Sequence, residues 1–208
     1  MANEFELDIA SLTAYLEANI DGFKGPLSAE KFAGGQSNPT YLIEAASGKY
    51  VLRRKPPGEL LKSAHAVDRE FRVMHALAST DVPVPKMRVL CDDDSVIGSM
   101  FYLMDFLDGR IMWDAALPGQ TPAERTAIYD AMNKVLADLH SVDIEKAGLS
   151  DYGKPGNYFE RQLSRWTTQY RASETETVPS MEKMMVWLSD NLPADDGLVC
   201  INHGDFRL

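Results

Sequence analysis

The first half of the chain alternates between apolar and polar residues with a period of two, a pattern typical of strands buried on one face. Helical spacing interrupts it at 8–20, where Asp8 is placed to cap the first turn, and again at about 64–79. The pair Ser47 and Gly48 indicates a tight hairpin between the second and third strands. Five strands are therefore predicted, at 28–33, 41–45, 49–54, 86–91 and 98–107.

From about residue 110 the apolar positions recur with the helical period instead. Thr121 and Glu124 form a capping pattern at the first of these helices, and Asn157 with Glu160 repeats it at the next. The methionine-rich face of the last helix indicates core. A short apolar run, 198–201, predicts a strand that leads into a loop. The helices are predicted near 122–140, 158–172 and 180–191.

A sheet followed by helices indicates an α+β fold, with a cleft expected at the junction, near 105–109. The 208 residues carry a net charge of −10, which argues against a nucleic-acid partner because phosphate binders need a basic stripe. The acidic N-terminus does not resemble a signal peptide, and the apolar runs are too short to span a membrane. Cys91 and Cys200 lie far apart without zinc-site spacing. We therefore expect a soluble, cytoplasmic protein that acts on small molecules.

Three segments of the first half carry candidate binding chemistry. The loop between the first two strands can bring backbone N–H groups close to an anion, although a glycine-rich hairpin can also be only a hairpin. It contains Gly34, Gly35, Gln36, Ser37 and Asn38. Strand alternation places Val51 and Arg53 on one face, where they could contact a base and phosphates. Arg54 lies on the other face unless a bulge intervenes, so the sequence leaves open which arginine faces the phosphates. Glu70 shares the buried face of its helix and needs a cation, for which Arg53 is the candidate.

The last candidate is the triplet His203, Gly204 and Asp205, which follows the apolar run. A carboxylate on such a loop could orient a substrate hydroxyl and accept its proton during phosphoryl transfer. Similar triplets are common in loops, so the position of this one at the end of an apolar run is what makes it a candidate.

Six segments of the chain, in order, resemble the aminoglycoside phosphotransferase family, which has a two-lobe fold like that of protein kinases. Their wording is most similar to the kinase-like branch associated with acyl-CoA dehydrogenases. The resemblance implies a five-stranded antiparallel N-lobe at 1–107 and the first part of a helical C-lobe at 108–208. The segments are FAGGQSNPTYLI, YVLRRKPPG, SAHAVDREFRVM, FYLMDFLDGR, LADLHSVD and INHGDF.

The same resemblance implies an enzyme that uses ATP and Mg²⁺ to phosphorylate a hydroxyl group of a small molecule, with a hydroxyacyl-CoA as one candidate. It implies Asp205 as the catalytic carboxylate and His203 as its support. Arg53 would replace the usual phosphate-binding lysine, and the backbone of Asp105, Phe106 and Leu107 would meet adenine.

The family's metal ligands, an Asn and an Asp, would follow Leu208. We therefore expect no metal ligand within these 208 residues and no turnover from them alone. Two alternatives stay open, a module that binds nucleotide or acyl-CoA without transferring phosphate, and an inactive fragment of the kinase.

Overall fold

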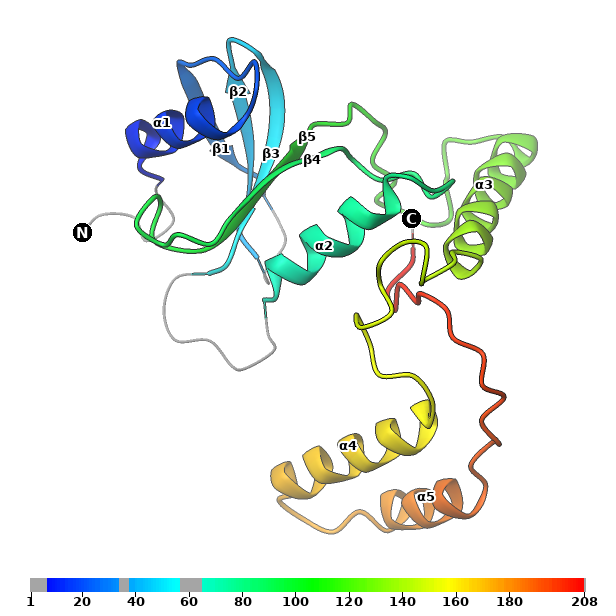
Figure 1. The fold of residues 1–208 in the computed structure, drawn as a ribbon. Helices are drawn as coiled ribbons and strands as arrows, with labels where there is room; N and C mark the ends of the chain where they lie inside the picture. The colour runs from blue at the N-terminus through cyan, green and yellow to red at the C-terminus, as the bar shows by residue number, and fades with distance from the viewer. Residues whose placement is uncertain (1–6, 34–37, 57–64, 208) are drawn as a thin grey trace. The chain divides into compact units, whose positions relative to one another are not determined.

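The computed structural model describes residues 7–33, 38–56 and 65–207, and its centre is a five-stranded antiparallel sheet of order β1-β2-β3-β5-β4. The helix α2 lies between β3 and β4 in the chain, as the sequence predicts (Figure 1). The predicted α+β fold is therefore confirmed. The strands are β1 (Leu27–Lys31), β2 (Thr40–Ala45), β3 (Gly48–Arg54), β4 (Met87–Cys91) and β5 (Phe101–Asp105). The helices are α1 (Ile9–Asn19), α2 (Val67–Leu77), α3 (Pro122–His140), α4 (Tyr158–Ser173) and α5 (Pro179–Asp190).

The pairing of the three central strands places polar side chains from β2, β3 and β5 in one row. The β2–β3 hairpin pairs Ala45 with Gly48, and the same register pairs Thr40 with Arg53. On its other side Arg53 pairs with Tyr102 of β5. Directly paired residues on neighbouring strands project to the same face of a sheet. Thr40, Arg53 and Tyr102 therefore share a face.

The two faces of the sheet carry different cores. The larger core contains Tyr50 and Leu52 of β3 together with Leu12 and Leu16 of α1. The smaller core lies on the other face, where Tyr102 packs with Val67 of α2. Figure 1 shows α1 beside β1 and α2 beside β4 and β5. Because side chains alternate along a strand, Val51 and Arg53 lie on the face that α2 covers.

Side-chain caps fix the starts of two helices as predicted. The Asp8 carboxylate accepts the Ser11 amide hydrogen bond at the start of α1. At α3, Thr121 and Glu124 form the complete reciprocal capping box. The predicted cap at Asn157 is wrong, because Asn157 has a φ of 48° and its side chain makes no capping bond. Its backbone N–H instead donates to the carboxylate of Asp195.

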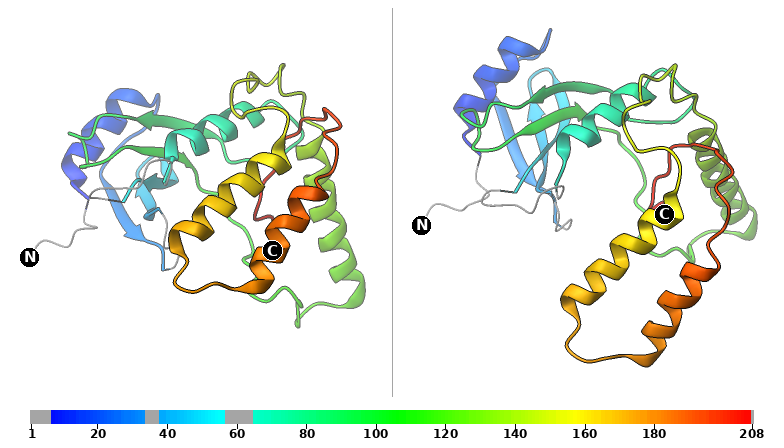
Figure 2. Two further views of the ribbon diagram at one scale, coloured as in Figure 1. Left: turned by 90° about the horizontal axis from the view of Figure 1, so that it is seen from below. Right: turned by 60° about the horizontal axis from the view of Figure 1, so that its bottom comes forward.

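The chain divides into two compact units, Met1–Val142 with His203–Leu208, and Asp143–Asn202. The second unit consists of α4, α5 and the segments around them, and the two helices lie side by side (Figure 2). Arg171 of α4 forms an ion pair with Glu182 of α5. The predicted boundary between residues 107 and 108 separates lobes by their function rather than by compactness. It therefore stays a prediction.

Two expectations about the second unit are wrong. Residues 198–201 form no strand, since the described chain brings no partner strand beside them and Leu198 is 84% exposed. The methionine face of α5 is not core here either, because Met184 is 53% exposed and neither α4 nor α5 contains a buried residue. Within the unit these two helices pack on one another along one side only.

No described helix has both the length and the apolar character needed to cross a membrane.

Candidate functional site

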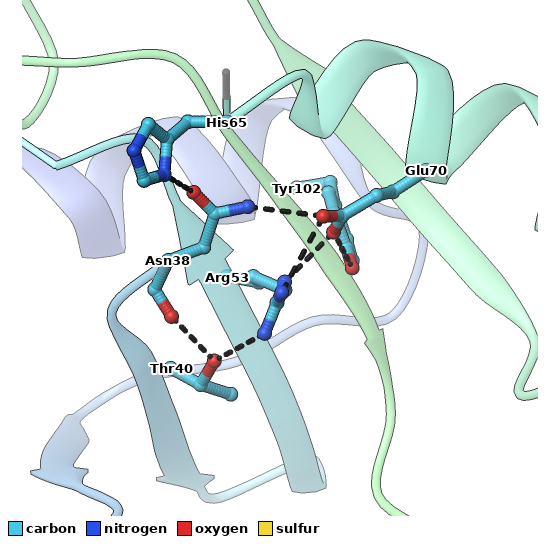
Figure 3. Close-up of polar contacts among 6 residues, drawn as sticks. All are labelled: Asn38, Thr40, Arg53, His65, Glu70 and Tyr102. Atoms are coloured by element: carbon cyan, nitrogen blue, oxygen red, sulfur yellow. Dashed lines mark hydrogen bonds and ion pairs between the residues drawn. The ribbon is translucent and has the colours of Figure 1, made fainter. Parts of the chain in front are cut away.

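Arg53 and Glu70 form an ion pair on the α2 face of the sheet, as their positions in the sequence predict. Arg53 Nε lies 2.7 Å from Glu70 Oε2, and Arg53 Nη2 lies 3.4 Å from Oε1 (Figure 3). The two side chains are 29% and 33% exposed. A side-on pair of this kind fixes the plane of the guanidinium group as well as its position.

Two further donors hold the Glu70 carboxylate. The Tyr102 hydroxyl donates to Oε2 at 2.9 Å, and Asn38 Nδ2 donates to Oε1 at 3.0 Å. Burial, followed by the neighbouring Glu70 carboxylate, raises the pKa of Tyr102 well above its ordinary value. Tyr102 therefore stays protonated and remains a donor at neutral pH. The ion pair is anchored to β5 by Tyr102 and to the segment before β2 by Asn38.

The guanidinium group of Arg53 keeps donors beyond those that the described residues use. Its Nη1 donates to the Thr40 hydroxyl at 3.1 Å, so three of its N–H groups bond to described residues. A guanidinium carries five N–H donors, which leaves one on each terminal nitrogen. Planar forks of this kind match the oxygens of a phosphate. Arg53 can therefore pair with Glu70 and bind an anion at the same time.

Arg54 points away from this site. Its side chain is buried, with the residue 3% exposed, and Nη1 donates to the Ile97 carbonyl oxygen at 3.2 Å. Ile97 belongs to the larger core, on the α1 side. The sequence left open which of the two arginines would face the site. The structure shows that Arg53, and not Arg54, forms the ion pair with Glu70. Its predicted contact with phosphates stays a prediction.

The predicted adenine-binding segment begins where β5 ends. Arg88 holds the Asp105 carboxylate with two bonds, Nε to Oδ1 at 2.6 Å and Nη2 to Oδ2 at 3.0 Å. The pairing of β4 with β5 shifts register between Met87 and Val89, so Arg88 lies where the ladder is irregular. Each oxygen of the Asp105 carboxylate thus accepts one bond from Arg88, which ties the end of β5 to β4.

The backbone of the same segment is partly used by the sheet. The Asp105 amide donates to the Lys86 carbonyl oxygen, and the Phe106 amide to that of Lys49. No described residue accepts a hydrogen bond from the Leu107 amide, and the Leu107 residue is 65% exposed. Leu107 can thus supply a backbone donor to a ligand. Val51 lies on the Arg53 face, is buried, and pairs with Met104.

The predicted phosphate loop lies mostly outside the described residues. Gly34, Gly35, Gln36 and Ser37 belong to the part of the chain that is not described, so their predicted role stays a prediction. Asn38 is described and is 3% exposed. Its side-chain amide is engaged with Glu70 and His65.

The predicted catalytic triplet forms a turn at the end of the described chain. The Asp205 amide donates to His203 Nδ1 at 3.3 Å, and Gly204 between them has a φ of 83°. Arg207 Nε lies 3.7 Å from Asp205 Oδ1, and the Asp205 side chain is 77% exposed. The His203 side chain thus accepts a hydrogen bond from the backbone of the loop, and the Asp205 carboxylate is exposed. Their catalytic roles stay predictions.

Three residues of the ion-pair network were not identified from the sequence: Thr40, His65 and Tyr102. The hairpin register could have revealed Thr40, because counting outward from the turn places it opposite Arg53. Tyr102 and His65 come from distant segments, and no spacing in the sequence marks them.

Comparison with known proteins places these features in a family. The model of the phosphotransferase enzyme family matches residues 28–208. Rat acyl-CoA dehydrogenase family member 11 is 46% identical over 209 aligned positions, and mouse acyl-CoA dehydrogenase family member 10 is 51% identical over 184. The crystal structure of a candidate aminoglycoside phosphotransferase from Ralstonia eutropha JMP134 is 53% identical, with a TM-score of 0.86.

The chain is shorter than all three of these proteins. The alignments include 99% of it with the rat protein, 88% with the mouse protein and 98% with the Ralstonia protein. They include 27% of the rat protein, 17% of the mouse protein and 59% of the Ralstonia chain.

Proposed function

Because this chain belongs to the phosphotransferase enzyme family, we propose that the complete protein transfers the γ-phosphoryl group of ATP to a hydroxyl group of a small molecule. The observation that carries the proposal is the Arg53–Glu70 ion pair. It holds a cation rigidly on the sheet while leaving one N–H on each terminal nitrogen of Arg53 for phosphate oxygens.

Each predicted nucleotide contact has a distinct task in this proposal. Arg53 binds phosphate oxygens, and Glu70 fixes the orientation of Arg53. Val51 offers an apolar surface to the base, and the amide of Leu107 donates to it. The segment 34–38 supplies backbone N–H groups to the phosphates. ATP supplies the phosphoryl group, and these side chains bind and orient it.

Asp205 acts on the acceptor hydroxyl. Its exposed carboxylate orients the hydroxyl and accepts its proton as the new bond to phosphorus forms. His203 holds the loop in place by accepting the Asp205 amide hydrogen bond. Arg207 Nε lies 3.7 Å from the same carboxylate.

The described residues bring no group of three His, Cys, Asp or Glu side chains together that could hold a metal ion. The family pattern places the metal ligands after residue 208. We therefore assign no step of the reaction to an ion held by the described residues.

A second candidate function is a module that binds nucleotide or acyl-CoA without transferring phosphate. The names of the rat and mouse relatives favour an acyl-CoA ligand, either as such a bound molecule or, as a hydroxyacyl-CoA, as the phosphate acceptor. The Asp205 carboxylate favours transfer, since a protein that only binds has no need of a proton acceptor.

The test uses the full gene product. ADP release is measured with ATP and magnesium in the presence of hydroxyacyl-CoAs, aminoglycosides, choline and simple sugars, one at a time. We expect acceptor-dependent ADP release with one of these classes. ATP binding in calorimetry without transfer to any acceptor would favour the binding module. No ATP binding at all would refute the proposed transfer and a nucleotide-binding module, and would leave only a module that binds acyl-CoA.

A further inference from the structure

Asn38 closes a ring of hydrogen bonds around the Arg53–Glu70 ion pair. Its side-chain amide donates to Glu70 Oε1 at 3.0 Å, and its backbone carbonyl accepts from the Thr40 hydroxyl at 3.1 Å. The same hydroxyl accepts from Arg53 Nη1 at 3.1 Å (Figure 3). Asn38 is thus connected to Glu70 directly and to Arg53 through Thr40, so it brackets the ion pair from both ends.

The orientation of the Asn38 amide follows from its partners. An ionised carboxylate can only accept hydrogen bonds, so the NH₂ group of Asn38 must face Glu70. The amide oxygen then faces His65, whose Nδ1 lies 2.8 Å away. Because that oxygen can only accept, His65 must carry a proton on Nδ1. Both the neutral Nδ1–H form and the imidazolium satisfy this contact.

The backbone conformation of His65 supports a role in orienting the Asn38 amide. Its φ of 62° is unusual for a residue with a side chain, and it lies just before Ala66, the N-cap of α2. This backbone conformation brings the imidazole to Asn38 rather than to the first turn of the helix. Asn38 is only 3% exposed, so water cannot replace either partner of its amide without a rearrangement.

We infer that Asn38 is a positioning residue for Arg53 and that His65 orients the Asn38 amide. The inference rests on the proposed binding of phosphates by Arg53. An arginine side chain has several rotatable bonds, and the ion pair orients Arg53 only as firmly as the Glu70 carboxylate is itself held. Glu70 held by Asn38, together with Thr40 held by the Asn38 carbonyl, removes that freedom. The two N–H groups of Arg53 that bond to no described residue then point in a fixed direction.

The test measures binding of a non-hydrolysable ATP analogue and of adenosine to the full gene product by calorimetry. In Asn38→Ala we expect the analogue to bind about tenfold more weakly, and adenosine to bind as in the wild type. His65→Ala should show part of this loss, and His65→Gln, which keeps a donor, should restore most of it. Equal weakening of both ligands would indicate a merely structural role and would overturn the inference.

A double-mutant cycle supplies the decisive control. If Asn38 acts through Arg53, Asn38→Ala should weaken analogue binding little further in the Arg53→Ala background. Additive losses would overturn the inference even if each variant folds. A wild type that binds the analogue with this pattern but transfers no phosphate would refute the proposed transfer and still support the positioning role. A wild type that binds neither ligand would overturn both.

Discussion

Arg53 and Arg54 are neighbours in β3, yet their side chains lie on opposite faces of the sheet and have unlike surroundings. Arg53 is paired with Glu70 beneath α2 and keeps part of its surface in solvent, whereas Arg54 is buried and donates to the Ile97 carbonyl oxygen. Because side chains alternate along a strand, Arg53 lies where it can bind a ligand and Arg54 lies in the core.

This separation predicts opposite effects for two adjacent substitutions. Arg53→Lys keeps the charge but loses the fork, so kcat/KM for ATP should fall about 10- to 100-fold with little change in stability. Arg54→Met keeps the bulk but leaves the Ile97 carbonyl without this donor, which should cost roughly 1–3 kcal/mol of stability. Chemical denaturation and steady-state kinetics measure both. The exposed Arg165→Lys on α4 is the control, and a kinetic defect confined to Arg54→Met would contradict the assignment.

The ion pair was predictable from the sequence, but most of its surroundings were not. Periodicity alone places Arg53 beside Val51 on one strand face and Glu70 on the buried side of α2, and a buried carboxylate needs a cation. Asn38 and Tyr102 each reach Glu70 across 32 residues, and His65 reaches Asn38 across 27, a convergence that depends on the register of β5 and on the φ of His65.

The errors in the sequence prediction have a common physical origin. Local signals were confirmed where the chain satisfies its own backbone groups, as in the capping box of Thr121 and Glu124. They failed where the structure depends on distant partners. The run 198–201 is apolar enough for a strand, but no described strand lies beside it to complete a ladder. At Asn157 the amide is satisfied by Asp195, 38 residues further on, rather than by a local cap.

The Leu107 amide offers a test of the adenine contact that changes a single donor. Leu107→Pro removes this N–H, and we expect affinity for both ATP and adenosine to fall about tenfold, since one hydrogen bond to the base is lost. Leu107→Ala keeps the amide and is the matched control. Calorimetry with adenosine separates this effect from phosphate binding. Equal affinities for the proline and alanine variants would show that the base is bound elsewhere.

Tyr102 predicts how stability depends on pH in the alkaline range. Its pKa is raised by burial and by Glu70, so the folded state holds the proton more tightly than the unfolded state. This contribution is fully present below the unfolded pKa of about 10 and is lost as pH rises above it. Burial also raises the pKa of Tyr41, so several groups add to the slope.

Tyr102→Phe should therefore flatten this dependence while lowering stability at neutral pH. The loss at pH 7 should be about 1 kcal/mol, because Glu70 loses one donor but keeps those of Arg53 and Asn38. Urea denaturation between about pH 8 and pH 11 measures both effects. The exposed Tyr158→Phe on α4 should leave the slope unchanged. A slope in Tyr102→Phe as steep as that of the wild type would mean that Tyr102 does not titrate with unfolding.

Asp205→Asn separates transfer from binding in the full gene product. The amide can still occupy the position of the carboxylate, but it cannot accept the proton of a substrate hydroxyl, so kcat should fall by about 10²- to 10⁴-fold. Affinity for ATP should stay within a few-fold, because the proposed nucleotide contacts at Arg53 and Leu107 are unchanged. Asp190→Asn, at the exposed end of α5, is the control. If Asp205→Asn keeps its turnover, the proton acceptor is another group, and the triplet is a supporting turn. If it loses ATP affinity and turnover together, Asp205 belongs to nucleotide binding instead.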